Sequence, residues 1–262
     1  MLSSSLIYYY NEICLYINIS LLVGFKGCGK SGALSQIIYW ARKNDWLVVY
    51  INSGHNLINT GDYLEKSKQI PGCWDQPQIA MKFLNNMIDA HQDKLRQIPL
   101  RTKFQLGKFE GKTLFDLVEF GSALEGYAAD AVVHFRRELS LVDEFPVLLA
   151  VDDYNAIYNR SVNFVDPESR RYNKDMLEGR NLTLARLFFD GHVDHGLING
   201  AFVGALTEEH KIEQFMEDTK EHETTWVNIP PYTRKEFDTV LEHYHRSGST
   251  SRTCPFPCYS DN

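Results

Sequence analysis

Eight residues near the start of the chain have the types and spacing of a loop that binds phosphate. The segment Gly24-Phe-Lys-Gly-Cys-Gly-Lys-Ser31 fits the pattern G-x-x-x-x-G-K-[ST], the Walker A motif. Glycines let successive backbone N–H groups turn toward an anion, the lysine can reach the outer phosphates, and the serine hydroxyl can bind Mg²⁺. We therefore expect a nucleotide to contact this loop and the start of the helix after it, at Gly24, Gly27, Cys28, Gly29, Lys30, Ser31 and Gly32.

Two carboxylates follow an apolar run farther along the chain. Pro146–Val151 has the composition of a buried strand, and Asp152 and Asp153 come directly after it. A strand that ends in Asp is the Walker B arrangement, in which Asp152 holds the Mg²⁺ together with Ser31. Asp153 stands where many related ATPases have a Glu that activates water. It is the candidate catalytic residue, although its side chain is one methylene shorter.

Thr207 ends a further predicted strand, Ala201–Leu206, and is a candidate contact to the γ-phosphate, with a helix cap as the alternative. The chain has no N-K-x-D motif for guanine and no D-x-x-G switch. These motifs therefore leave the base open: GTP, GDP and ATP all fit the expected site, with Mg²⁺.

Predicted strands alternate with predicted helices around these residues. Apolar residues at helical spacing follow the glycine-rich loop, and further helices are expected over residues 76–95, 113–139, 182–189 and 233–244. The last of these begins with a capping box and is expected to bury Phe237, Val240, Leu241 and Tyr244. This alternation predicts one α/β domain with a parallel sheet and helices on both faces.

Composition and weaker motifs disfavour several classes of function. A formal charge of −7 over 262 residues argues against a protein that coats nucleic acid with its whole surface. The basic segment Lys94–Lys112 is either a solvated loop or a local contact to RNA phosphates.

A zinc site is disfavoured because the spacings of the candidate ligands do not match C-x₂-C pairs. These candidates are His192, His195, His243, His245, Cys254 and Cys258. The apolar start is interrupted by Asn11, Glu12 and Asn18, which disfavours a membrane span.

Several segments resemble one family, that of the GTP-binding protein of the mitochondrial small ribosomal subunit, or death-associated protein family. The most specific are the pattern D-x-x-N-A-[IL]-Y/W, here Asp152 to Tyr158, and Y-x-x-x-E-F, here Tyr232 to Phe237. The resemblance spans about Leu21 to Arg246. It implies an AAA/STAND-like P-loop fold, and it departs at Asp153, where the family often has Gly.

The resemblance also implies a function: a structural component of the mitochondrial small ribosomal subunit that binds a guanine nucleotide. Its expected partners are mitochondrial ribosomal proteins, with rRNA as a further candidate and no membrane. The implied location is the mitochondrial matrix, although no import presequence is visible in this chain. Slow GTPase activity or none is expected. The alternative is a P-loop ATPase or STAND-type switch that hydrolyses nucleotide.

The expected domain organisation has three parts. Residues 1–20 form an atypical N-terminal segment, residues 21–246 a P-loop nucleotide-binding domain, and residues 247–262 a C-terminal tail.

Overall fold

Five short segments pair into a parallel sheet in the order β2-β5-β8-β1-β9. The computed structural model describes residues 19–59, 63–156, 161–162, 177–189, 196–207 and 224–246. The sheet strands are β1 (Ile19–Val23), β2 (Leu47–Ile51), β5 (Val147–Val151), β8 (Gly200–Ala205) and β9 (Thr224–Asn228). The predicted parallel sheet is confirmed. Both flanking segments of the predicted domain organisation lie almost wholly outside the described residues, so that organisation stays a prediction.

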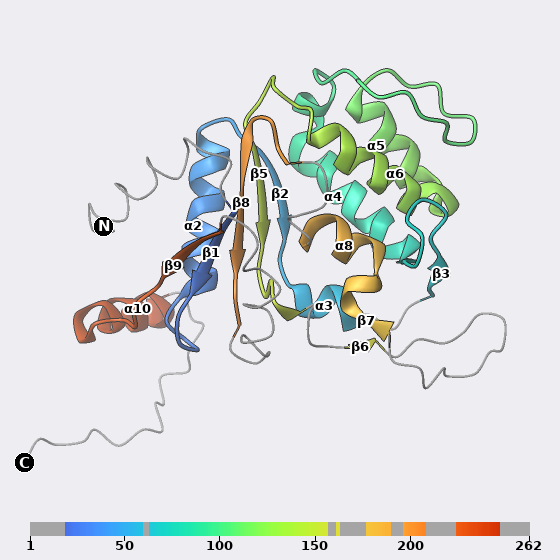
Figure 1. Ribbon diagram of the computed structural model, residues 1–262. Helices are drawn as coiled ribbons and strands as arrows, with labels where there is room; N and C mark the ends of the chain where they lie inside the picture. The colour runs from blue at the N-terminus through green and yellow to red at the C-terminus, as the bar shows by residue number, and fades with distance from the viewer. Residues whose placement is uncertain are drawn as a thin grey trace, which may run out of the picture.

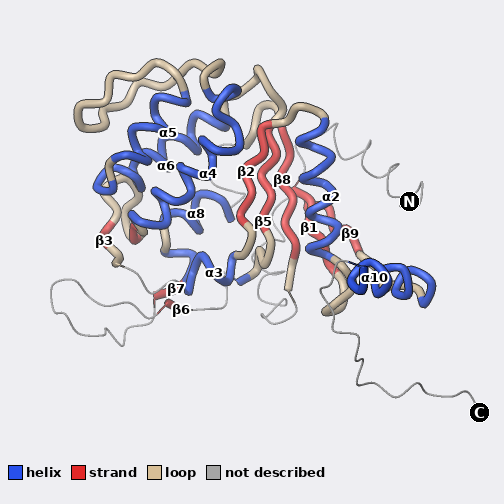
Figure 2. Tube along the Cα trace, turned by 180° about the vertical axis from the view of Figure 1, so that it is seen from behind, coloured by secondary structure: helices blue, strands red, loops and turns tan. Residues whose placement is uncertain are grey.

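Helices cover both faces of this sheet, as Figures 1 and 2 show. Helix α2 (Lys30–Lys43) lies on one face, and α4 (Pro77–Leu95), α5 (Leu114–Ala123), α6 (Glu125–Leu139) and α8 (Thr183–Phe189) lie on the other. Successive strand residues point to opposite faces. Accordingly Val48 and Leu148 pack in the cluster that contains α2, whereas Val49 and Leu149 pack in the cluster with the other helices. The continuous apolar runs of the strands follow from burial on both sides.

The remaining described elements are short. They are α3 (Gly54–Asn59), the antiparallel pairs β3 (Glu65–Lys66) with β4 (Trp74–Asp75) and β6 (Ser161–Val162) with β7 (Leu177–Glu178), the 3₁₀ turn η1 (Gly179–Asn181), and α10 (Arg234–Arg246). Within the described parts of the chain, no helix is both long enough and apolar enough to span a bilayer.

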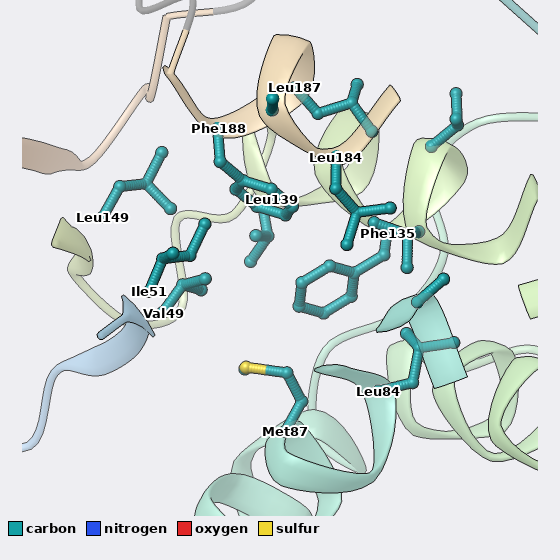
Figure 3. Packing of buried hydrophobic residues seen from close by; sticks show 14 of the residues in the cluster. Val49, Ile51, Leu84, Met87, Phe135, Leu139, Leu149, Leu184, Leu187 and Phe188 are labelled. Atoms are coloured by element: carbon teal, nitrogen blue, oxygen red, sulfur yellow. The ribbon is translucent and has the colours of Figure 1, made fainter. Parts of the chain in front are cut away.

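The larger core lies between the sheet and the helices α4, α6 and α8 (Figure 3). Phe135 of α6 and Phe188 of α8 are both buried, and the ring of Phe83 lies 5.9 Å from the first and 5.0 Å from the second, centroid to centroid. Leu84 and Met87 of α4 belong to the same cluster of buried side chains. Aromatic and aliphatic side chains of these helices therefore form one continuous packed layer on this face of the sheet.

The single helix predicted over residues 113–139 is wrong, because the structure has two. The predicted start is confirmed: Thr113 Oγ1 accepts from the Asp116 amide, and Asp116 Oδ2 accepts from the Thr113 amide. Leu124 then has extended backbone angles, φ −129° and ψ 95°, and separates α5 from α6. Both segments are apolar at helical spacing, so periodicity alone does not reveal a break at which the second helix turns back onto the first.

The C-terminal helix also differs from expectation. Its capping box is confirmed, since the Thr233 amide donates to Glu236 Oε2 at 2.9 Å and the Glu236 amide donates to Thr233 Oγ1 at 3.4 Å. Two of the side chains predicted to be buried are instead exposed, Phe237 at 50% and Leu241 at 36%, and Val240 is half-buried. In Figures 1 and 2, α10 projects away from the sheet beyond β9. The side chain of Tyr244 lies outside the described residues.

The basic segment is ordered against the body of the protein. The buried Glu138 carboxylate on α6 accepts from the backbone amides of Arg101 and Thr102, at 2.8 and 2.9 Å. Arg101 forms ion pairs with Asp143 and Glu144, and Lys94 pairs with Asp45 at 2.8 Å. Part of the positive charge in this segment is thus neutralised internally, while Lys103 and Lys108 are exposed.

Candidate functional site

The glycine-rich loop joins β1 to α2 through three glycines with positive φ, the first of which, Gly24, has φ +146°. Gly27 has φ +82° and Gly29, the N-cap of α2, has φ +96°. Such angles are accessible to glycine at little cost. Within the described residues, no side chain caps α2 and no acidic residue lies in its first turn. The positive end of the helix and its first amide groups are therefore directed toward the loop.

Lys30 folds back over this loop. Its ammonium group donates to the carbonyl oxygens of Gly24, at 2.7 Å, and Phe25, at 2.9 Å, and lies 3.9 Å from the Cys28 sulfur. The Cys28 side chain is buried, and its amide donates to the Phe25 carbonyl at 3.2 Å. In this arrangement Cys28 stabilises the turn of the loop, while Lys30 places a positive charge at its mouth.

Ser31 and Asp152 meet, as the sequence predicts. A hydrogen bond from the Ser31 hydroxyl links the start of α2 to the carboxylate that follows β5. Burial raises the pKa of Asp152, and the bonds from Ser31 and from the Asp153 amide partly offset this effect. A carboxylate and a hydroxyl in contact beside a cationic loop are the groups that hold Mg²⁺ on bound phosphates.

The candidate catalytic residue points to a different neighbour. Asp153 Oδ2 accepts a hydrogen bond from the Ser53 hydroxyl at 3.0 Å, and Ser53 in turn accepts from the Asn56 amide at 3.1 Å. Asp153 also has a left-handed backbone angle, φ +53°. These contacts attach Asp153 to the start of α3. Ser53 was not singled out by sequence analysis, and a serine after a strand carries no distinctive signal.

Thr207 lies at the same edge of the sheet. Its amide donates to Asn155 Oδ1 at 2.8 Å, and its carbonyl accepts from Asn155 Nδ2 at 2.7 Å. Asn155 is fully buried, with an exposed fraction of 0%. In the sequence it appears only as part of the D-x-x-N-A pattern. Its spacing from Asp152 is the signal that could have indicated a role.

The segment that follows β9 packs on the glycines of the loop. A β-carbon added at Gly29 would lie 2.3 Å from the Tyr232 hydroxyl, and one added at Gly24 would lie 2.4 Å from the Ile229 carbonyl. Glycine at these two positions is thus explained by close approach as well as by φ. By contrast, a β-carbon at Gly32 would meet nothing within 4 Å.

The structure thus brings together most of the predicted site. The loop follows β1, Thr207 follows β8 and Asp152 follows β5, and these three strands are neighbours. The histidine and cysteine positions considered for zinc lie mostly outside the described residues. Within the described part of the chain, no group of three or more His, Cys, Asp or Glu side chains could hold a metal ion.

One strand, β8, separates the loop-bearing β1 from the strand that ends at Asp152. That order, with a glycine-rich phosphate-loop sequence between β1 and α2, defines a P-loop NTPase fold of the AAA/STAND-like kind.

Residues 19–221 match a family model described as mitochondrial ribosomal death-associated protein 3. The chain therefore belongs to that family, and the resemblance inferred from its motifs is confirmed.

Curated relatives agree with this assignment. The chain is 26% identical over 243 residues to small ribosomal subunit protein mS29 of Mus musculus, an alignment that covers 86% of this chain and 60% of the mouse protein. It is 34% identical over 148 residues to the Bos taurus protein of the same name, covering 54% and 37% of the two chains. The chain thus spans about 60% of the length of the mouse relative.

Solved structures with detectable similarity are more distant. A DNA replication initiation factor has 11% identity and a TM-score of 0.41, and its alignment covers 95% of this chain and 51% of that one. The ORC2 protein of Aeropyrum pernix in its ADP form has 11% identity and a TM-score of 0.44, with 93% and 51% covered.

Proposed function

We propose that this chain is a component of the mitochondrial small ribosomal subunit, located in the matrix, that binds a guanine nucleotide and Mg²⁺ through its glycine-rich loop. The observation that carries the ribosomal part is the family match together with the relatives' name. Its partners would be mitochondrial ribosomal proteins. The exposed lysines of the basic segment are the candidate contacts to rRNA.

The nucleotide part rests on the donor groups of the loop. A helix end without a side-chain cap in the described residues, a lysine over the loop, and the Ser31–Asp152 contact fit a phosphate group with its metal. Gly24, Gly27, Cys28, Gly29, Lys30, Ser31 and Gly32 would hold the phosphates, and Ser31 and Asp152 would hold the metal. When bound, Mg²⁺ would neutralise phosphate charge.

We further propose that the bound nucleotide acts mainly as a structural element and is hydrolysed slowly or not at all. The Asp153 carboxylate accepts from Ser53 and is attached to α3, which leaves it poorly placed to activate water. A ligand that binds only the folded chain stabilises it by mass action, by about 2.7 kcal/mol at a hundredfold excess over Kd. The nucleotide would thus increase the stability of this subunit.

Thermal unfolding with and without nucleotide tests the binding. MgGDP and MgGTP are expected to raise the Tm of the wild-type chain, and MgADP to raise it less. Lys30→Ala should lose the shift. Lys26→Ala, which removes the same charge from an exposed position in the same loop, should keep most of it. Equal shifts in both variants would contradict binding through Lys30.

Sedimentation of the tagged chain in a gradient of mitochondrial lysate tests the ribosomal role. We expect the chain to sediment with small-subunit rRNA and to remain there in high salt. Migration as a free monomer would contradict the proposal. Phosphate release that depends on Asp152 would favour the hydrolysing switch instead.

A further inference from the structure

The loop between α4 and α5, residues 96–113, is a long projection with a defined shape. The structure describes all of it and finds no helix or strand there. Loops longer than about 12–15 residues without secondary structure are uncommon and often functional. The two ends of the α4–α5 loop are paired, since the Leu100 amide donates to the Lys112 carbonyl at 2.9 Å and the Leu114 amide donates to the Ile98 carbonyl at 2.8 Å. The loop lies at the side of the molecule away from α10 (Figures 1 and 2).

Four aromatic rings form a row from this loop onto the two helices that follow it. Phe104 and Phe109 of the loop are stacked, with ring centroids 5.8 Å apart. The Phe109 ring lies 5.4 Å from that of Phe120 on α5, which in turn lies 5.5 Å from that of Tyr127 on α6. A β-carbon at Gly107 would lie 2.8 Å from the Tyr127 ring, so the loop rests directly on it. Tyr127 is nevertheless 38% exposed and the other three residues are half-buried, so the whole row reaches the surface.

Buried groups of α6 hold the loop in place from below. The Glu138 carboxylate accepts from the Arg101 and Thr102 amides, and the Phe104 ring is stacked on the His134 ring with centroids 4.0 Å apart. Both Glu138 and His134 are buried. Because these contacts already order the loop in the free protein, a ligand that binds there does not have to order it.

The loop also concentrates positive charge in a chain that is negative overall. Residues 94–112 contain six basic side chains and one acidic side chain, whereas the whole chain has a formal charge of −7. Lys94 and Arg101 are paired with carboxylates. Lys103, Lys108 and Lys112 are exposed and form no ion pair within the part of the chain that the structure describes. Two of these lysines directly precede the stacked phenylalanines of the loop, so free positive charge and aromatic rings lie side by side.

We propose that the α4–α5 loop and this row of rings form a binding surface for a single-stranded segment of RNA. The proposal rests on the ribosomal role proposed above and names the form of RNA that the basic segment contacts. Lysine ammonium groups attract the phosphates of the backbone, and an exposed aromatic ring offers its face to an unstacked base. The bases of a duplex are already stacked on one another, so only a single strand or a loop uses both kinds of group. Tyr127, the most exposed of the four aromatic residues, is the ring on which a base stacks.

The first test measures the charge contribution, as the affinity of the whole chain for a fluorescently labelled single-stranded RNA of mixed sequence at several salt concentrations. Replacing Lys103, Lys108 and Lys112 together by Gln should weaken binding and reduce the slope of log K against log salt by about 2, because each phosphate contact on a single strand contributes about 0.7. Lys108→Gln alone should reduce it by about 0.7. Lys235→Gln, which removes an exposed charge from α10, is the matched control for this single variant and should leave the slope unchanged.

The second test separates stacking from charge. Tyr127→Leu removes the aromatic ring but keeps an apolar side chain beside Gly107. It should weaken binding about tenfold, as expected for the loss of one base stacked on an aromatic ring, and should leave the salt slope unchanged. Tyr39→Leu is the matched control, because Tyr39 on α2 is 64% exposed but lies outside the proposed surface. This variant should bind the RNA as the wild type does.

The contrary results are distinct. A wild-type chain that binds no single-stranded RNA, or that binds a duplex of the same sequence as tightly, overturns the proposal. Losses in the loop variants no larger than those in Lys235→Gln and Tyr39→Leu also overturn it. Ultraviolet cross-linking of small subunits from mitochondria is expected to join the loop to rRNA, and cross-links to a ribosomal protein alone would assign the surface to a protein partner instead. The proposed ribosomal role fails separately, if the isolated chain binds RNA through this loop but does not sediment with the small subunit.

Discussion

Asp153 combines an unfavourable backbone conformation with a single side-chain hydrogen bond. Its φ of +53° lies in the left-handed region, which costs a residue with a β-carbon about 1–2 kcal/mol. The Ser53 hydroxyl bond offsets part of this cost. Strain of this kind is often found at functional sites, and here it lies directly beside Asp152. The backbone at this position, more than the carboxylate, determines where the turn after β5 leads.

Two substitutions at Asp153 separate strain from the hydrogen bond. Asp153→Ala and Asp153→Gly both remove the bond to Ser53, but only glycine relieves the left-handed conformation. Asp153→Gly should therefore be more stable than Asp153→Ala by about 1 kcal/mol in urea unfolding. Ser53→Ala is the control: it leaves Asp153 in place and removes the same bond, together with the bond that Ser53 accepts from the Asn56 amide. Equal stability of the two Asp153 variants would show that the backbone relaxes.

At the scale of elements, α5 and α6 approach each other at a residue without a side chain. A β-carbon at Gly121 would lie 2.4 Å from the Ala131 β-carbon and 2.6 Å from a methyl carbon of Leu84. Small residues at a helix contact let the two backbones come close. The break at Leu124 and the glycine at position 121 therefore belong to the same feature, a contacting helix pair against which α4 also packs.

Gly121→Ala should destabilise the protein by about 1–3 kcal/mol, because the added methyl group overpacks this contact. Gly126→Ala is the matched substitution on α6. Its β-carbon would meet nothing within 4 Å, so the higher helix propensity of alanine should stabilise the protein by up to about 1 kcal/mol. Urea unfolding of both variants gives the comparison. The same sign of change in both would contradict close packing at Gly121.

Local sequence signals predicted the ends and turns of these elements better than they predicted which elements pack together. The two capping boxes and the loop glycines depend on residues a few positions apart, and they were found correctly. The break at Leu124 and the exposure of Phe237 depend on what each helix packs against, which periodicity does not specify. The two hydrogen bonds between the Asn155 side chain and the Thr207 backbone join the ends of two strands that lie far apart in the sequence, so only the folded sheet reveals them.

At the scale of the whole molecule, two buried histidines link stability to pH. His91 Nε2 lies 2.9 Å from the carbonyl oxygen and 3.2 Å from the amide nitrogen of Val48 on the edge strand β2, at a point where α4 has non-helical backbone angles. The His134 ring is stacked on Phe104 with centroids 4.0 Å apart, and neither of its nitrogens has a hydrogen-bond partner in the described residues. Burial lowers the pKa of each side chain to about 4.

Because these folded-state pKa values lie below the unfolded value near 6.5, the unfolded chain binds more protons between pH 6.5 and 4. The stability that neutral His91 and His134 allow is present above pH 6.5 and is lost as the pH falls through this window. From pH 7 to pH 5 each histidine should lower the free energy of unfolding by about 2 kcal/mol. His134→Phe, which keeps an aromatic ring against Phe104, should remove its own share of that loss while leaving the share of His91. Urea unfolding at the two pH values measures the difference, and a loss as large as that of the wild type would show that His134 is hydrated or already protonated in the folded protein.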